Sequence, residues 1–86
     1  MKYGIELAKE AEVDLEYLLR ADRKLFARLF ARLETLSSDP FQGKPLVGNH
    51  KGEYSLRVSN YRIVYEPDPI KHIVYILTIK HRKHVY

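Results

Sequence analysis

The clearest secondary-structure signal in this chain lies in Glu53-Tyr54-Ser55-Leu56-Arg57-Val58-Ser59-Asn60-Tyr61-Arg62-Ile63-Val64-Tyr65-Glu66. Apolar and polar side chains alternate on either side of Ser59-Asn60, which is typical of strands that bury one face. The apolar positions on one face are Tyr54, Leu56 and Val58 in the first strand and Tyr61, Ile63 and Tyr65 in the second. Because only two turn-forming residues separate the strands, this stretch predicts a β-hairpin.

Two helices and two further strands flank the hairpin in the sequence pattern. The predicted elements are strands at 2–6, 53–58, 61–66 and 72–79 and helices at 8–20 and 22–36. Asp22 is suited to cap the second helix, since its carboxylate can accept from a free N–H of the first turn. The order β-α-α-β-β-β predicts one α+β domain over residues 1–86, with a helical hairpin packed on a small antiparallel sheet. The segment 46–47 could add a short strand.

One face of the sheet should carry the helices, and side-chain parity assigns residues to the other. Val64, Val74 and Ile76 are expected on the face opposite the tyrosines, together with Arg57 and Arg62. An apolar patch edged by cations indicates a partner segment that is both hydrophobic and acidic. An ordinary sheet with a few exposed valines explains the pattern equally well.

Positive charge is concentrated in the C-terminal half of the chain. The net charge is +4, yet residues 1–43 carry seven Lys or Arg against eight Asp or Glu, whereas residues 44–86 carry eight against three. The chain ends in Lys80-His81-Arg82-Lys83-His84-Val85-Tyr86, directly after an apolar strand. Arg and Lys bind phosphate, His moves protons near neutral pH and Tyr stacks on bases, so this end suits an RNA substrate.

Several chemistries are excluded or disfavoured by composition. The chain contains no cysteine, so a disulfide, an iron–sulfur cluster or a thiolate zinc site is impossible. The pair His81 and His84 does not have metal-ligand spacing in a non-helical tail, and we expect neither a metal nor a cofactor. The sequence shows no membrane span and no signal peptide, and we expect a cytoplasmic protein.

Four ordered motifs carry a family resemblance that covers essentially the whole chain. They are Asp39-Pro40-Phe41, the strand 54–58, the strand 61–65 and the closing His81-Arg82-x-x-Val85-Tyr86. Together with the helical hairpin, they resemble the RelE/ParE superfamily of bacterial and archaeal toxins. The Arg-x-x-Val-Tyr ending resembles the RelE branch, whose members cleave mRNA in the ribosomal A site. Members of the ParE branch instead poison DNA gyrase and need no nuclease residues.

The resemblance implies metal-independent cleavage, in which the RNA 2′-hydroxyl attacks the adjacent phosphate. Arg62 and Arg82 match the arginines that stabilise the phosphate charge, and Tyr86 matches the tyrosine that stacks on or orients the substrate. His81 or His84 could carry the proton. Further RNA contacts are expected from Lys44, Lys51, Arg57, Lys80, Lys83 and His84. The implied partners are the ribosome with its mRNA and a cognate acidic antitoxin, which would join the toxin in a hetero-oligomer.

The chain departs from the RelE pattern at the position of the general base. RelE carries two lysines on the strand where this chain has Glu53 and Ser55. The role of the base is therefore vacant, or it falls to Glu53, His81 or His84. Lys44 and Lys51, in the preceding loop, could supply the missing charge. An inert antitoxin-binding scaffold is a further alternative. Arg57 could contact phosphate, or it could pair with Glu53 or Glu66.

Overall fold

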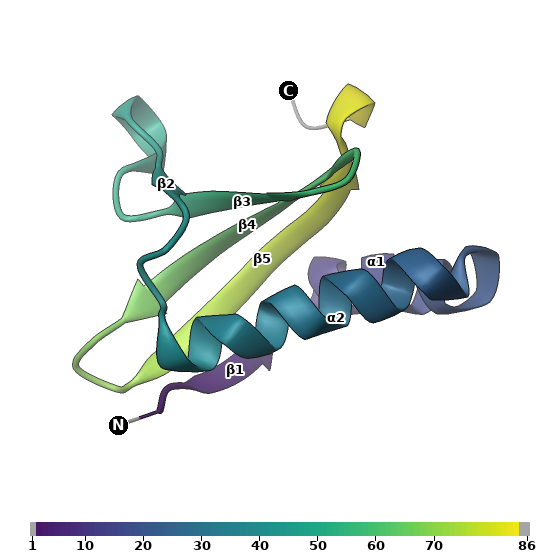
Figure 1. Cartoon of the computed structure of the whole chain (residues 1–86). Coiled ribbons are helices and arrows are strands. Elements are labelled where there is room, and N and C mark those ends of the chain that lie inside the picture. The colour runs from purple at the N-terminus through teal and green to yellow at the C-terminus, as the bar shows by residue number, and fades with distance from the viewer. Residues whose placement is uncertain (1, 85–86) are drawn as a thin grey trace.

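The computed structural model describes residues 2–84, which form two helices and five strands together with two short 3₁₀ turns (Figure 1). The elements are β1 (Gly4–Leu7), α1 (Lys9–Ala21), α2 (Arg23–Ser38), β2 (Lys44–Pro45), η1 (Gly48–His50), β3 (Tyr54–Val58), β4 (Tyr61–Asp68), β5 (Ile73–His81) and η2 (Arg82–His84). The predicted hairpin is confirmed as β3 and β4. The short added strand forms two residues earlier than expected, at β2.

The five strands form one mixed sheet in the order β1-β5-β4-β3-β2. The prediction of an antiparallel sheet is correct for β2 to β5 and wrong for β1, which pairs with β5 in parallel, Gly4 opposite Ile73 and Leu7 opposite Ile76. An alternating pattern reports which face a side chain takes, and it carries no information on strand direction. The architecture is nevertheless the expected α+β arrangement of two helices on a sheet.

Both helices cover the same face of the sheet, and the core lies between the two layers (Figure 1). The core residues are Ala11, Leu15, Leu18, Leu29, Leu33, Leu36, Leu56, Val58, Ile63, Tyr65, Val74, Ile76 and Ile79. Asp22 caps α2 as predicted, because its Oδ1 accepts a hydrogen bond of 3.1 Å from the N–H of Leu25. Neither helix within residues 2–84 is both long and apolar enough to cross a membrane.

An irregularity in β5 changes the face that its residues take. Val64 pairs with Thr78 but Tyr65 pairs with Ile76, so Leu77 is an extra residue without a partner in β4. Ile76 and Ile79 consequently both enter the core, and the prediction that Val74 and Ile76 lie on the far face is wrong. The far face, which we call the open face, carries Ser55, Arg57, Arg62 and Val64.

Gly43 allows the loop after α2 to approach the sheet closely. Its N–H donates to the hydroxyl of the fully buried Tyr65 at 2.9 Å. A Cβ at this position would lie 2.6 Å from both the Ser55 carbonyl oxygen and the Tyr65 hydroxyl oxygen. The loop that leads into β2 is therefore fixed against β3 and β4, and this fixes the position of Lys44 on the sheet.

Candidate nucleic-acid interface

Arg57 and Arg62 are direct cross-strand neighbours on the open face. They are register partners in β3 and β4, and directly opposed residues have Cβ atoms about 4.5–5.5 Å apart. Within residues 2–84, no ion pair joins Arg57 to Glu53 or Glu66, so the alternative of a salt bridge is not realised. An anion bound between two guanidinium groups on neighbouring strands can accept hydrogen bonds from both.

Lys44 extends this charge across the sheet. It is the register partner of Ser55, and Ser55 in turn pairs with Val64, so Lys44 leaves β2 on the open face. The structure thus places Lys44, Arg57 and Arg62 on the same face of three neighbouring strands. Lys51 is exposed in the turn before β3 and is not part of this row.

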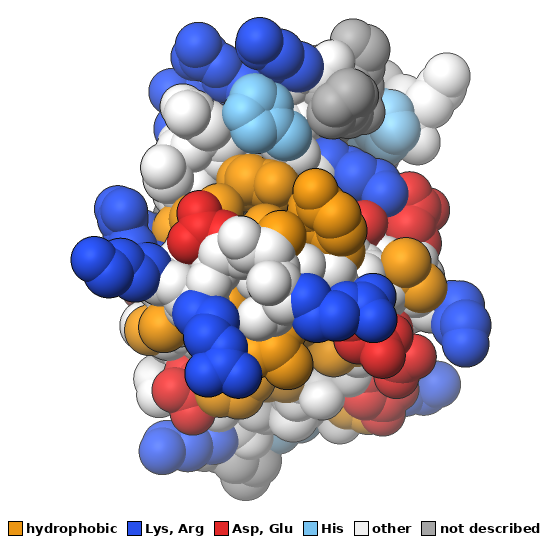
Figure 2. Space-filling model, turned by 90° about the vertical axis from the view of Figure 1, so that its right-hand side faces the viewer, with side chains coloured by type: hydrophobic (Ala, Val, Ile, Leu, Met, Phe, Trp, Pro, Cys, Tyr) orange, Lys and Arg blue, Asp and Glu red, His pale blue; other side chains and the backbone are white. Residues whose placement is uncertain are grey.

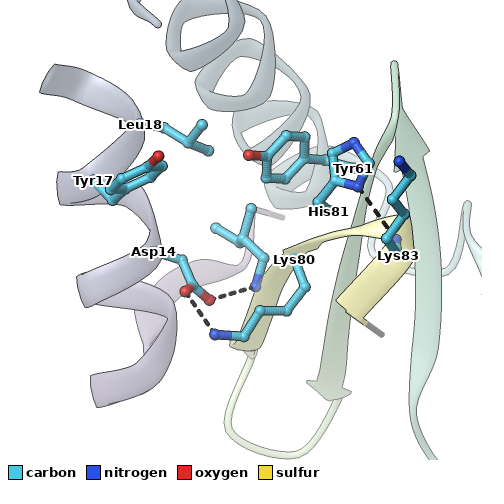
Figure 3. A pocket seen from close by; sticks show the side chains of 8 residues that line it. Asp14, Tyr17, Leu18, Tyr61, Lys80, His81 and Lys83 are labelled. Atoms are coloured by element: carbon cyan, nitrogen blue, oxygen red, sulfur yellow. Dashed lines mark hydrogen bonds and ion pairs between the residues drawn. The ribbon is translucent and has the colours of Figure 1, made fainter. Parts of the chain in front are cut away.

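Lys80 belongs to the same cross-strand row by register, since it pairs with Arg62, but its ammonium group is bound to α1. Its Nζ lies 2.8 Å from Asp14 Oδ1 and 3.2 Å from Glu10 Oε2 (Figure 3). The hydrogen bond to Asp14 raises the pKa of Lys80 above its usual value. The expected RNA contact of Lys80 is therefore opposed by two carboxylates that already neutralise it.

His81 lies on the helix-covered face and not beside Arg62. It is the register partner of Tyr61, and the two rings meet edge to face with centroids 5.4 Å apart. Its Nδ1 accepts from the backbone N–H of Lys83 at 3.2 Å, which leaves Nε2 to carry the proton of the neutral ring. By register, the side chains of His81 and Arg62 therefore lie on opposite faces of the sheet.

Arg82 begins η2 beside the turn between β3 and β4. Its backbone N–H donates to the carbonyl of Asn60 at 2.7 Å, which continues the ladder one residue beyond β5. The side chains of Arg82 and Lys83 are both exposed. Tyr86 and the side chain of His84, both predicted to act on RNA, lie outside the part of the chain that the structure describes.

Glu53, one of the open alternatives for the base, contacts a histidine. Its Oε1 lies 3.3 Å from Nδ1 of His50, three residues earlier. This contact joins the carboxylate, just before β3, to the last residue of η1. Across residues 2–84, no group of three or more His, Asp or Glu side chains could hold a metal ion.

A hollow between α1 and the ends of β4 and β5 was not expected from the sequence (Figure 3). We call it the tyrosine hollow; its main lining residues are Asp14, Tyr17, Leu18, Tyr61, His81 and Lys83. The sequence pattern placed Tyr61 on the apolar face of its strand. Asp14 lies four residues before Leu18, and Tyr61 lies four residues before Tyr65. Neither spacing indicates that α1 and β5 meet at this place.

The family model for the ParE toxin of the type II toxin–antitoxin system parDE matches residues 5–86. Among solved structures, the chain is similar to the toxin–antitoxin complex RelBE2 from Mycobacterium tuberculosis, with 30% identity over 95% of this chain and 100% of that chain and a TM-score of 0.84. No curated protein sequence matches.

Two more distant structures share the fold. The YoeB/ParE toxin from Agrobacterium tumefaciens is 19% identical over 91% of this chain and 96% of that chain, with a TM-score of 0.82. The archaeal RelE–RelB complex from Pyrococcus horikoshii is 20% identical over 99% of this chain and 100% of that chain, with a TM-score of 0.76. With the family model spanning nearly the whole chain, the protein belongs to the RelE/ParE superfamily of type II toxin–antitoxin toxins.

Proposed function

We propose that this toxin is an endoribonuclease that cleaves mRNA in the ribosomal A site without a metal ion. The observation that carries the proposal is the row of Lys44, Arg57 and Arg62 on the open face, next to the strand that leads into Arg82. Three cations from neighbouring strands form a binding surface for a phosphate backbone. The ribosome would supply much of the substrate positioning.

The proposed reaction is an intramolecular transfer at one phosphate. A base takes the proton of the RNA 2′-hydroxyl, the 2′-oxygen bonds to phosphorus, and the bond to the 5′-oxygen breaks as that oxygen gains a proton. The products are a 2′,3′-cyclic phosphate and a 5′-hydroxyl. Arg62 and Arg82 would stabilise the charge that builds up on the non-bridging oxygens, and Tyr86 would stack on the substrate. Of the candidates for the base, His81 has the least suitable position, because it lies on the other face from Arg62.

The same surface suits an acidic antitoxin. The structural relatives include toxin–antitoxin complexes, among them RelBE2 from Mycobacterium tuberculosis and YoeB–YefM from Staphylococcus aureus. An antitoxin segment with carboxylates would bind the row of Lys44, Arg57 and Arg62 and cover it against RNA. We therefore propose a hetero-oligomer with a cognate antitoxin in the cytoplasm.

A second candidate function is inhibition of DNA gyrase without nuclease chemistry. It is favoured by the match to the ParE toxin model over residues 5–86. The occurrence of Glu53 and Ser55, where the RelE pattern has lysines, also agrees with a binding protein, either a gyrase inhibitor or an inert scaffold. Gyrase inhibition would depend on a protein interface and not on Arg82 or Tyr86.

Primer extension on an mRNA in a translating extract, with and without ribosomes, separates these functions. We expect ribosome-dependent cuts within codons for the wild type, loss of the cuts in Arg82→Ala, and normal cuts in Lys71→Ala, an exposed cation in the turn between β4 and β5. A gyrase supercoiling assay is run in parallel. Absence of cuts together with gyrase inhibition would replace the ribonuclease proposal by the second candidate.

A further inference from the structure

The tyrosine hollow has the dimensions of a ligand site. Its volume is about 510 Å³, within the range of roughly 300–1,000 Å³ that is typical of small-molecule pockets. The buried side chains of Leu18 and Ile79 form its apolar base. A second hollow of about 350 Å³ shares Tyr17, Tyr61 and His81 with the first and extends to the β3–β4 turn.

Three aromatic rings from three different elements line the hollow. Tyr17 comes from α1, Tyr61 from β4 and His81 from β5, and the hydroxyls of both tyrosines point into the space between α1 and the sheet (Figure 3). Tyr17 is 60% exposed, so one ring is accessible to a flat ligand from solvent. Burial, followed by the charge of Tyr17, Asp22 and Asp14, raises the pKa of Tyr61, so that its hydroxyl remains a hydrogen-bond donor at neutral pH.

The hollow carries one carboxylate that is already paired and an exposed cation at its edge. Asp14 is the acid that lines it, and this carboxylate is paired with Lys80 at 2.8 Å. Lys83 is exposed at the edge of the hollow, and His81 lies beside it. Figure 2 shows this end of the molecule, with hydrophobic side chains in the middle and both Lys or Arg and Asp or Glu side chains around them.

We propose that the tyrosine hollow binds one unstacked base of single-stranded RNA. The base would stack on the ring of Tyr17 and contact the Tyr61–His81 pair. Lys83 would contact the phosphate of the same nucleotide. The proposal rests on the proposed ribonuclease function and deepens it, because it assigns a place to a nucleotide that flanks the one being cleaved. Asn60, in the adjoining hollow, offers an amide donor and acceptor to a base edge.

The position of the basic C-terminal end connects this hollow to the open face. Lys80 and His81 take opposite faces of β5, and Arg82 follows directly at the end of the sheet. An RNA strand whose scissile phosphate lies at Arg82 therefore has the row of Arg57 and Arg62 on one side and the hollow on the other. Bound RNA would pass around the end of β5.

The chemistry of the hollow favours RNA over a side chain of a protein partner. A different hollow of about 330 Å³ is lined by Ile5, Leu7, Leu15, Phe30, Leu33 and Glu34. The lining of that hollow is mainly aliphatic and aromatic and contains no cation, which suits a hydrophobic side chain of a protein partner. The tyrosine hollow instead combines its rings with two phenol hydroxyls, an imidazole and the exposed ammonium group of Lys83. Aromatic rings next to a cation are typical of sites for single-stranded nucleic acid.

The test is an NMR titration of the ¹⁵N-labelled chain with a 2′-O-methyl RNA hexamer, which cannot be cleaved because its 2′-oxygen carries no proton. We expect saturable shifts at the amides of Tyr17, Tyr61 and Lys83. Since stacking of one base on an aromatic ring is worth about 1–3 kcal/mol, Tyr17→Ala should raise the Kd by about 5- to 150-fold. Lys83→Ala should weaken binding and reduce its salt dependence.

Matched controls are available on the same elements. Val13→Ala removes an exposed apolar side chain one turn earlier on α1, and Lys71→Ala removes an exposed cation far from the hollow. Both should bind the hexamer as the wild type does. A dispersed ¹H–¹⁵N spectrum for each variant shows that it is folded.

Three outcomes would overturn the proposal. They are no binding of the hexamer, shifts confined to the open face around Arg57 and Arg62, and an unchanged Kd in Tyr17→Ala. If Tyr17→Ala binds RNA normally but binds the purified antitoxin more weakly, the occupant is a protein segment. Hexamer binding at the hollow without mRNA cleavage would contradict the proposed ribonuclease function and support the base-binding site. Cleavage of mRNA, together with an unchanged Kd of Tyr17→Ala for the hexamer, would support the ribonuclease function and contradict the site.

Discussion

Asp14 on α1 accepts a hydrogen bond of 3.0 Å from the backbone N–H of Ile79, a residue 65 positions further along the chain. The pairing of β1 with β5 ends at Ile76, so the edge of β5 beyond this point has no strand beside it. The carboxylate takes the place of the missing strand and pairs with Lys80 as well. This contact fixes the last residues of β5, and with them the beginning of the basic C-terminal end.

Loss of the Asp14 carboxylate should lower the free energy of unfolding, because it removes both the acceptor for the Ile79 N–H and the charge beside Lys80. Asp14→Leu leaves the Ile79 N–H and the Lys80 ammonium without this acceptor, and should reduce the free energy of unfolding by about 1–3 kcal/mol. Asp14→Asn keeps an acceptor for Ile79 and should cost less. Urea denaturation measures both, and amide hydrogen exchange at Ile79 should accelerate most in the leucine variant.

Glu10→Gln is the control for this prediction. Glu10 is a second, more exposed partner of Lys80, and exposed ion pairs contribute about 0–1 kcal/mol. Equal decreases in the free energy of unfolding for Glu10→Gln and Asp14→Leu would show that the stabilisation comes from the charge beside Lys80. The hydrogen bond from Ile79 to Asp14 would then contribute nothing measurable.

Gly43 should not tolerate a side chain. In Gly43→Ala, the added Cβ would overlap the Ser55 carbonyl and the Tyr65 hydroxyl, each 2.6 Å away, and overpacking of this kind costs about 1–3 kcal/mol. Gly4→Ala is a matched control, because the nearest atom to its Cβ would be the His72 carbonyl oxygen at 3.9 Å, an ordinary contact. Thermal unfolding should show a lower Tm for the first variant and little change for the second. Equal Tm values would contradict the close approach of this loop.

Stability should fall at alkaline pH, partly because of Tyr65. Burial raises the pKa of this phenol, so the folded state keeps its proton where the unfolded state has lost it. Unfolding then releases protons, and the free energy of unfolding decreases as the pH rises above about 10. Lys80, whose pKa is also raised, acts in the same direction.

Tyr65→Phe removes the ionisable phenol and thereby isolates the part of the alkaline loss of stability that comes from Tyr65. Between pH 6 and 8 its stability should run parallel to that of the wild type, and between about pH 10 and 11.5 it should decrease less steeply. Urea denaturation across both ranges gives the two slopes. Identical alkaline slopes would show that Tyr65 titrates alike in the folded and unfolded states.

His81 should affect substrate binding more than the chemical step. It lies on the face of the tyrosine hollow and away from Arg62, so His81→Ala should raise KM and change kcat by less than about tenfold. A general acid or base typically contributes about 10²- to 10⁴-fold to the rate. Steady-state cleavage of ribosome-bound mRNA gives the two constants. A fall in kcat of that size, with loss of one limb of the pH profile, would restore His81 as the proton carrier.

Short-range patterns predicted most of the fold. Alternation around Ser59-Asn60 gave the β3–β4 hairpin, and Asp22 marked the start of α2, because both signals depend on neighbours in the sequence. The direction of β1 and the face of Ile76 were wrong, since one depends on long-range pairing and the other on the extra residue Leu77.

The candidate site shows the same division. The placement of Arg57 and Arg62 on one face follows from strand parity and was predicted. The pairing of Lys80 with Asp14 and the position of Tyr17 beside Tyr61 were not, because α1 and the end of β5 are distant in the sequence and meet only in the folded chain.

The most direct test of the proposed function is the single-turnover rate of mRNA cleavage on the ribosome by Arg62→Ala, with Lys71→Ala as the control. Arg62 lies on the open face opposite Arg57, where a phosphate would be bound. Loss of one group that stabilises transition-state charge typically costs about 10²- to 10³-fold. We expect a loss of this size in Arg62→Ala at saturating ribosomes and a wild-type rate in Lys71→Ala. Cleavage by Arg62→Ala at the wild-type rate would contradict the assignment of the open face as the catalytic surface.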